Sequence, residues 1–178
     1  TVPPTMAATE RQENGPWPSQ DALEDPNARA PLVVRAIIRW GSLLVRSHYR
    51  VTMRGEPFPR EAPVLLVQNH SNGLADAHFA MVATRRPIRI LVKYRLMKTA
   101  DSCEEIDRAL VEGAVIVLFP EGESLDAIGI RPMKSGVARM AISAETSTGE
   151  PVGVLSVPLG VTYEARDRYR SEASAVLG

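Results

Sequence analysis

Two short loops in this sequence combine the residue types that acid–base chemistry uses. The first runs Asn-His-Ser-Asn-Gly-Leu-Ala-Asp over residues 69–76, and the second runs Phe-Pro-Glu-Gly-Glu-Ser over 119–124. Each follows an apolar run of the length and composition typical of a buried strand. Because open α/β sheets commonly bind ligands at the carboxyl ends of their strands, a functional site is expected at these loops.

His70 and Asp76 would point to different faces of a continuous helix, because six residues at 3.6 per turn rotate the side chain by about 240°. They can meet only if His70 lies in a loop and a helix begins around Asn72–Gly73, where the Asn/Gly composition favours a turn. Asp76 would then fix the imidazole tautomer, and the other ring nitrogen would take a proton from an attacking hydroxyl. On spacing alone, a structural or surface histidine is the more common case.

The surrounding pattern predicts strands that alternate with helices. Strands are expected over Val51–Arg54, Val64–Gln68, Ile88–Val92, Ala114–Phe119, Val152–Val157 and Val161–Tyr163, and helices over Asp76–Ala83, Ser102–Val111 and Lys134–Ala144. This alternation favours the α/β class, with a mixed, largely parallel sheet flanked by helices. Residues 1–31 hold six of the fourteen prolines and almost no apolar periodicity, so they are predicted to be a disordered leader before a domain over 32–178.

Residues 32–48 predict an amphipathic helix at the start of that domain. Arg35, Arg39, Ser42 and Arg46 recur at helical spacing, and apolar residues fill most of the other positions. Two interpretations remain open. The helix packs on the domain core, or it lies in a membrane interface with its arginines on lipid phosphates and Trp40 at the headgroup level.

Composition narrows the class of partner. Lys+Arg and Asp+Glu are both 21, so the overall basic field that nucleic-acid binders use is absent. Cys103 is the only cysteine, which excludes an intrachain disulfide and favours a reducing compartment. Three scattered histidines lack metal-ligand spacing, so no metal is expected. No signal-peptide pattern and no run of ~18 apolar residues is present, so contact with a membrane would be peripheral, on its cytoplasmic side.

Four blocks of sequence together resemble a known family. They are Asn69-His70 with Asp76, then Phe119-Pro120-Glu121-Gly122, then the run Pro-Met-Lys-Ser-Gly-Val-Ala-Arg over 132–139, and Val-Pro-Leu-Gly-Val-Thr-Tyr over 157–163. In this order they are similar to the glycerol-3-phosphate and 1-acylglycerol-3-phosphate (PlsC-like) acyltransferases. Five residues separate His70 from Asp76 where the common form has four, which resembles the branch containing bacterial and fungal glycerol-3-phosphate acyltransferase-like proteins.

The resemblance implies a reaction and a set of site residues. His70, oriented by Asp76, would deprotonate a hydroxyl of glycerol-3-phosphate or a lysophospholipid. That hydroxyl would attack the thioester of acyl-CoA or acyl-carrier protein, a step of phospholipid biosynthesis that needs no further cofactor. The residues implied in substrate binding are Asn69, Glu121, Gly122 and Ser124. Candidate cations for the phosphate are Lys93, Arg95, Lys134 and Arg139, and for each of them a solvated surface charge is at least as open an interpretation.

One departure from the family leaves other functions open. The family has a longer segment, with a Gly…Arg motif for the acceptor phosphate, where Leu96–Ala100 here runs almost directly into Ser102. The domain is therefore expected to be shortened in the middle and at its C-terminal end, or to lack a loop and tail in the sequence as given. The alternatives are a non-catalytic lipid-binding protein of this fold and a thioesterase-like hydrolase, although no Gly-x-Ser-x-Gly elbow is present.

Overall fold

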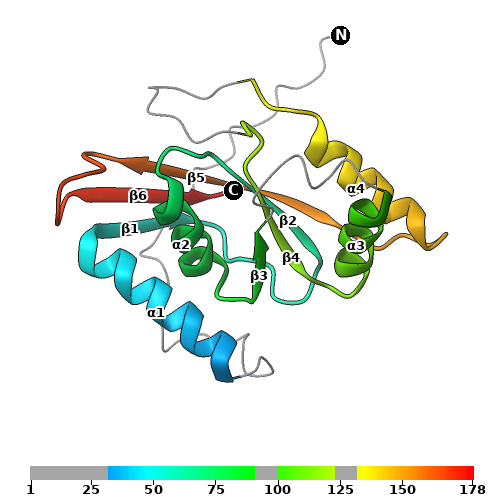
Figure 1. Cartoon of the computed structure of the whole chain (residues 1–178), viewed down its shortest axis with the longest axis horizontal. Coiled ribbons are helices and arrows are strands. Elements are labelled where there is room, and N and C mark those ends of the chain that lie inside the picture. Colours follow the sequence, from blue (N-terminus) through cyan, green and yellow to red (C-terminus); the bar gives the residue numbers. More distant parts are fainter. Residues whose placement is uncertain (1–31, 91–99, 123–131) are drawn as a thin grey trace, which may run out of the picture.

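A computed structural model describes residues 32–90, 100–122 and 132–178, where one sheet separates two pairs of helices (Figure 1). The helices are α1 (Leu32–His48), α2 (Gly73–Thr84), α3 (Ala100–Val111) and α4 (Gly136–Ser147). The strands are β1 (Arg50–Gly55), β2 (Val64–Gln68), β3 (Ile88–Ile90), β4 (Val115–Leu118), β5 (Leu155–Tyr163) and β6 (Glu172–Leu177). None of the helices in these ranges has both the length and the apolar character needed to cross a bilayer.

The six strands form one sheet in the order β1-β6-β5-β2-β4-β3. Every neighbouring pair is parallel except β5 and β6, which run antiparallel with Val161 opposite Ala175. The mixed, largely parallel α/β sheet predicted from the sequence is therefore confirmed. The predicted amphipathic helix is also present as α1.

Alternation along β2 builds a separate core on each face of the sheet. Val64 and Leu66 pack with buried residues of α1, α2, β5 and β6, among them Val45, Phe79 and Leu177. Leu65, which points the other way, packs with buried residues of α3 and α4. Because successive side chains of a strand face opposite sides, the continuous apolar run of β2 is what a doubly covered strand requires.

The connections leave β2 and β4 toward opposite faces, and this creates the place for a site. β2 leads into α2 on one face, whereas α4, which follows β4, covers the other. β2 and β4 are adjacent parallel strands, with Val67 opposite Leu118. Where neighbouring strands send their connections to opposite faces, a crevice opens at their carboxyl ends. The two polar loops recognised in the sequence follow these two strands.

Among the described helices, none covers the second face of β5. Ser156, Pro158, Gly160 and Thr162 alternate toward this face and are exposed, while the intervening residues are buried against α2. The helices α3 and α4 cover only the β2 and β4 side of this face. Pro158, Gly160 and Thr162 line a cavity next to the crevice.

Several predicted boundaries differ from the structure. The two strands expected over Val152–Val157 and Val161–Tyr163 are one strand, β5. Pro158 lies inside this strand without breaking the sheet. Its carbonyl accepts a hydrogen bond from the N–H of Gly178, so its backbone nitrogen also faces the end of β6. The missing N–H of proline therefore costs no hydrogen bond to β2. Strand β6 was not predicted, because Ala173 and Ala175, which alternate inward, have weak strand propensity.

The helix boundaries shift by a few residues. α2 begins at Gly73 rather than Asp76, and α4 covers Gly136–Ser147 rather than Lys134–Ala144. α3 begins at Ala100, so Ser102 lies inside its first turn and does not start the helix. Residues 1–31 and 91–92 lie outside the described ranges.

Arg86 joins the amino ends of β2 and β4. Its guanidinium donates to the carbonyls of Pro59 and Ala62, both at 2.8 Å, and to the carbonyl of Gly113 at 2.7 Å. The side chain is buried, and burial lowers its pKa from the usual value. One planar cation thus satisfies three carbonyls of the loops that enter the two site-bearing strands.

Replacing Arg86 with Met should lower the free energy of unfolding by about 3 kcal/mol, because three carbonyls lose a charged donor. Urea denaturation followed by circular dichroism measures the change. Arg89→Met is the matched control, since Arg89 is exposed and only 3.7 Å from Glu112, and should cost less than about 0.5 kcal/mol. Equal losses in the two variants would contradict this role of Arg86.

Candidate active site

His70 and Asp76 meet at the carboxyl end of β2. The Nδ1 atom of His70 lies 3.0 Å from Oδ2 of Asp76, and the side chains are 19% and 0% exposed. The contact forms because α2 begins at Gly73, which has a φ of 29° in the region that favours glycine. His70 therefore lies in the loop and Asp76 in the first helical turn, which is the arrangement that their spacing required.

The carboxylate of Asp76 is buried but fully hydrogen-bonded. Oδ2 accepts from His70 and from the backbone N–H of Asn72 at 2.7 Å. Oδ1 accepts from the hydroxyl of Tyr163, also at 2.7 Å. A buried charge is tolerated when such donors replace water, and the positive end of the α2 dipole adds to their effect. Asp76 is thus fixed by its own loop and by the end of β5.

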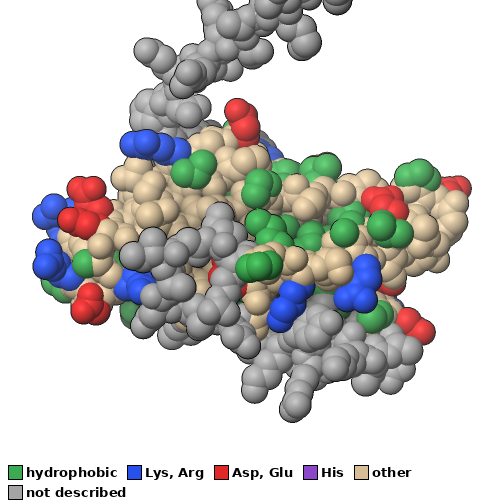
Figure 2. Space-filling view, turned by 90° about the horizontal axis from the view of Figure 1, so that it is seen from above, with side chains coloured by type: hydrophobic (Ala, Val, Ile, Leu, Met, Phe, Trp, Pro, Cys, Tyr) green, Lys and Arg blue, Asp and Glu red, His purple; other side chains and the backbone are tan. Residues whose placement is uncertain are grey.

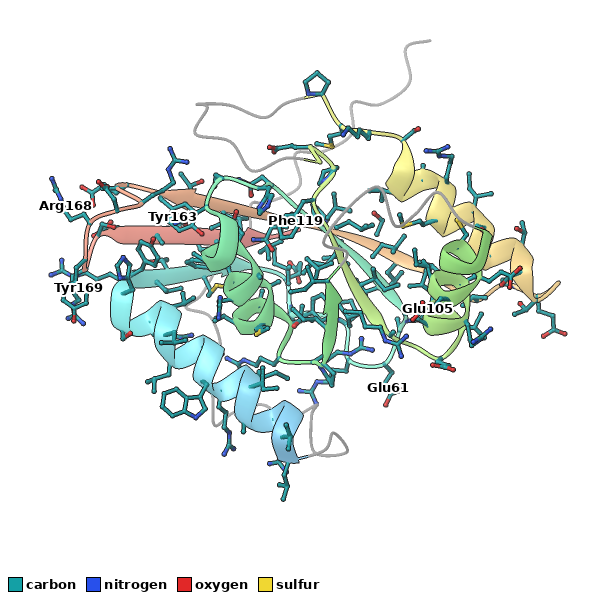
Figure 3. All side chains as sticks on the ribbon, viewed as in Figure 1. Glu61, Glu105, Phe119, Tyr163, Arg168 and Tyr169 are labelled. Atoms are coloured by element: carbon teal, nitrogen blue, oxygen red, sulfur yellow. The ribbon has the colours of Figure 1, made fainter. Side chains whose placement is uncertain are left out.

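The imidazole of His70 is held from two directions. Its ring stacks on Phe119, with centroids 4.0 Å apart and an interplanar angle of 23°. Because the Asp76 carboxylate only accepts, Nδ1 must carry the proton, and Nε2 is left with its lone pair. Within the described ranges no protein group bonds to Nε2. This is the geometry of a general base. Figure 3 labels Phe119, which stacks on the imidazole, and Tyr163, which bonds to Asp76.

Tyr163 is one of three aromatic residues packed beside the carboxylate. Its ring lies 5.2 Å from Tyr49 and 5.5 Å from Phe79, between centroids. Burial raises the pKa of Tyr163 far above its usual value, and the hydrogen bond to Asp76 raises it further. The Tyr163 hydroxyl is therefore protonated at every pH at which the protein is used, and it donates to Asp76.

Further bonds tie the His70 loop to β5 and to the segment after it. The side-chain amide of Asn69 donates to the carbonyl of Val161 at 2.8 Å and accepts from its N–H at 2.7 Å. Arg166 donates from Nη1 to the carbonyl of Ser71 at 2.6 Å. The loop is therefore positioned by residues about ninety positions away in the sequence.

Asn72 connects the loop to the end of α1. Its side-chain amide donates to the hydroxyl of Tyr49 at 2.8 Å, and that hydroxyl donates to the carbonyl of Arg166 at 2.5 Å. Burial raises the pKa of Tyr49, so its hydroxyl also remains a donor. Tyr49 directly follows α1, which places that helix in contact with the site loop through one side chain.

The second polar loop forms a tight turn after β4. The N–H of Gly122 donates to the carbonyl of Phe119 at 3.0 Å, and the N–H of Lys134 donates to that of Pro120 at 3.1 Å. Gly122 has a φ of 78°, and the Lys134 ammonium fills the space that a Cβ on Gly122 would need. Only glycine fits there without displacing the lysine.

A cavity of about 490 Å³ opens beside these loops, along the end of β5. It is lined by Val67, Gln68, Asn69, Ser71, Pro120, Glu121, Met133, Pro158, Leu159, Gly160, Val161, Thr162, Tyr163 and Arg166. His70 does not line it, although both its neighbours in the chain do. Figure 2 shows apolar side chains gathered in the middle of the surface seen from above, with acidic and basic ones near the left end.

Two buried polar atoms of the cavity residues lack a hydrogen-bond partner in the described part of the chain. Oε1 of Gln68 and Oγ of Ser71 are buried and have no hydrogen-bond partner among the described residues. Glu121 and Arg166 bring opposite charges to the same cavity. A mostly apolar cavity with a few polar groups, next to an oriented histidine, is the usual form of a ligand site.

The structure brings together only part of the residue set predicted from the sequence. His70 and Asp76 are in contact, Asn69 and Glu121 line the cavity, and Lys134 covers Gly122. Arg139 lies exposed on the first turn of α4 and is not among the cavity residues. Lys93, Arg95 and Ser124 lie outside the described ranges, so their roles stay predictions.

Three residues of the site had no predicted role. They are Tyr49, Tyr163 and Arg166. The fourth sequence block ends in Tyr163, so its position was visible, but its function depends on which strand lies beside β2. Arg166 had no signal beyond being a cation soon after that block. His48, given no role in the site, packs edge-on to Tyr49 with ring centroids 4.5 Å apart.

Known proteins share both sequence and fold with this chain. The acyltransferase family model matches residues 94–162. An uncharacterised acyltransferase of Schizosaccharomyces pombe is 44% identical over 75 residues, which are 42% of this chain but only 11% of the yeast protein. The crystal structure of the 1-acyl-sn-glycerophosphate (LPA) acyltransferase PlsC from Thermotoga maritima has a similar fold, with a TM-score of 0.62 at 16% identity. That match covers 82% of this chain and 67% of the Thermotoga chain.

Removing the Asn69 side chain should destabilise the site loop and, with it, the domain. Asn69→Ala leaves the N–H and carbonyl of Val161 without their partner, so the free energy of unfolding should fall by about 2 kcal/mol. Urea denaturation measures it. Thr162→Val, at an exposed neighbouring position on β5, should change it by less than about 0.5 kcal/mol. If the urea midpoint of Asn69→Ala equals that of the wild type, the two hydrogen bonds between Asn69 and Val161 do not stabilise the domain.

Proposed function

We propose that this chain is an O-acyltransferase of phospholipid biosynthesis, because the acyltransferase family model matches residues 94–162 and the fold is similar to that of the Thermotoga PlsC. The acyl group moves from acyl-CoA or acyl-carrier protein to a hydroxyl of glycerol-3-phosphate or a lysophospholipid. The observation that supports this most is the 3.0 Å contact between His70 and the buried carboxylate of Asp76. It leaves an unprotonated imidazole nitrogen at the carboxyl edge of the sheet.

The proton transfers follow from this geometry. Nε2 of His70 takes the proton of the acceptor hydroxyl as its oxygen attacks the thioester carbonyl carbon. Asp76 stabilises the imidazolium that forms, because its charge lies next to the Nδ1 proton. When the tetrahedral intermediate collapses, the carbon–sulfur bond breaks and the leaving thiolate takes the proton from Nε2. The ester and the free thiol are the products, and His70 returns to its starting state.

The cavity supplies groups that suit a phosphorylated alcohol. Glu121 can accept a hydrogen bond from a hydroxyl, and Arg166 lines the same space with a planar cation that matches a phosphate. Lys134, above the Gly122 turn, adds a second positive charge nearby. Lys93, Arg95, Ser124 and Arg139 remain proposed contacts from the family resemblance. Asn69 contributes by positioning the loop, since its amide already bonds to Val161.

His70→Ala should lower the rate of acyl transfer at least ~100-fold, because the acceptor hydroxyl loses its general base. The measurement is thiol release from acyl-CoA in the presence of glycerol-3-phosphate or 1-acylglycerol-3-phosphate, with the lipid product identified by mass spectrometry. His48→Ala is the matched control and should keep the rate within about 2-fold, because His48 lies outside the cavity.

Three outcomes would contradict the proposed function. Transfer that is unchanged in His70→Ala would exclude His70 as the base. Release of free fatty acid by the wild type without any acceptor, and no ester with one, would identify a hydrolase instead. Absence of both reactions with each acceptor would favour the non-catalytic lipid-binding alternative.

We also propose that α1 rests on a membrane surface, on the cytoplasmic side. One side of this helix packs inward through buried Ile38 and Val45. The opposite side exposes large apolar residues, which are Leu32, Val33, Ile37, Trp40, Leu43 and Leu44, each more than half exposed. Arg39 and Arg46, both exposed, can reach anionic headgroups from the same helix. Both sequence interpretations of residues 32–48 are thus compatible with one helix.

The double variant Trp40→Asp, Leu44→Asp should bind vesicles of phosphatidylcholine and phosphatidylglycerol at least about 10-fold more weakly than the wild type, because two apolar side chains no longer enter the interface. Co-sedimentation measures binding. Ile142→Asp is the matched control, because Ile142 is 65% exposed on α4, close to the 64% of Trp40, and should bind normally. Equal binding by all three proteins would contradict an α1 interface.

A further inference from the structure

We propose that Tyr163 is a positioning residue of this site, acting on His70 through Asp76. Its hydroxyl holds one carboxylate oxygen at 2.7 Å, so that the other oxygen stays directed at Nδ1 of His70. The predicted effects on reaction rate rest on the proposed acyl transfer, whereas the predicted effect on the His70 tautomer does not. The site then contains a chain of three groups, in which a phenol orients a carboxylate and the carboxylate orients an imidazole.

The division of donors between the two carboxylate oxygens supports this role. Oδ2 receives both bonds from the His70 loop, one from the imidazole and one from the N–H of Asn72. Tyr163 is the only described side chain that bonds to Oδ1. Without it, one oxygen of a 0% exposed carboxylate would have no partner, and the carboxylate plane could turn away from the imidazole.

The first turn of α2 is held by the side chain of Asp76 and not by a hydrogen bond from the side chain of its N-cap residue. Asn72 occupies the N-cap position, but its side chain makes no capping bond and donates to Tyr49 instead. The bond from the N–H of Asn72 to Asp76 therefore fixes the first turn. Because Tyr163 fixes Asp76 in turn, the geometry of the whole His70 loop depends on a residue of another strand.

Tyr163 is rigid enough for this task. It is the last residue of β5, where it is paired with Ala173 of β6. Its ring is packed against Tyr49 and Phe79. Its raised pKa keeps the hydroxyl a donor, and a carboxylate can only accept, so the direction of the bond is fixed. A supporting group of this kind orients a functional side chain without touching the substrate.

Tyr163→Phe removes the hydroxyl and keeps the ring. It should lower kcat/KM about 10-fold, mostly in kcat, because a buried carboxylate loses one of its three bonds. The acid limb of the pH–rate profile should move to higher pH, since a less satisfied carboxylate favours the protonated imidazole. In an Asp76→Ala background the same substitution should cost less than about 2-fold, because Tyr163 acts through Asp76.

A second readout does not need activity. In protein labelled with ¹⁵N-histidine, the wild type should show His70 as the Nδ1–H tautomer, and Tyr163→Phe should show a mixture of tautomers. Thr84→Val is the matched control, because it removes a buried hydroxyl at the other end of α2 that bonds to the backbone of Arg86 and not to Asp76. It should lower the melting temperature similarly and leave both the tautomer and the acid limb in place.

The outcomes separate this inference from the proposed function. A wild type without transfer activity, whose His70 tautomer still depends on Tyr163, would refute the acyltransferase and keep the positioning role. An active protein in which Tyr163→Phe changes neither the acid limb nor the tautomer would refute the positioning role alone. If Tyr163→Phe does not fold, 3-fluorotyrosine at position 163 keeps the ring and strengthens the donor, and should move the acid limb to lower pH.

Discussion

The carboxylate of Asp76 is buried, and the rest of the site is arranged to keep its charge satisfied. Water cannot reach it, so each of its oxygens needs a donor from the protein. The loop before α2 supplies two donors and β5 supplies the third. These requirements fix where α2 begins, which ring nitrogen of His70 carries a proton, and which strand lies next to β2. A change in any of the three would leave a buried charge without a partner, which is costly.

The sheet provides the rigid frame for these bonds. β2 lies between β4 and β5, so the loop after β2 touches the ends of both neighbours. Phe119, after β4, stacks on the imidazole, and Val161 in β5 bonds to Asn69. Because α2 and α4 lie on opposite faces, the chain leaves the carboxyl ends of β2 and β4 in opposite directions, and the cavity lies beside the loops that follow these strands and along residues 158–163 of β5.

Tyr49 joins the membrane-facing helix proposed here to the site. It follows α1 directly, bonds to Asn72 in the loop and to the carbonyl of Arg166, and packs against Tyr163. Arg166 then returns to the loop through the carbonyl of Ser71. A helix whose outer face is apolar and whose last turn leads to this network would bring the site close to a lipid acceptor. The same contacts make α1 part of the folded domain, since Ile38 and Val45 are buried.

The sequence by itself determined the fold class, the two polar loops and the requirement that a helix begin near Asn72–Gly73 if His70 and Asp76 are to meet. These follow from local signals, which are apolar runs, turn residues and spacing along one segment. The tertiary structure decided the strand order, the continuity of β5, the antiparallel β6, and the meeting of Tyr163 and Arg166 with the His70 loop. Those contacts join residues about ninety positions apart, and no local pattern encodes them. They depend on which strand packs beside β2, and only the folded sheet specifies that.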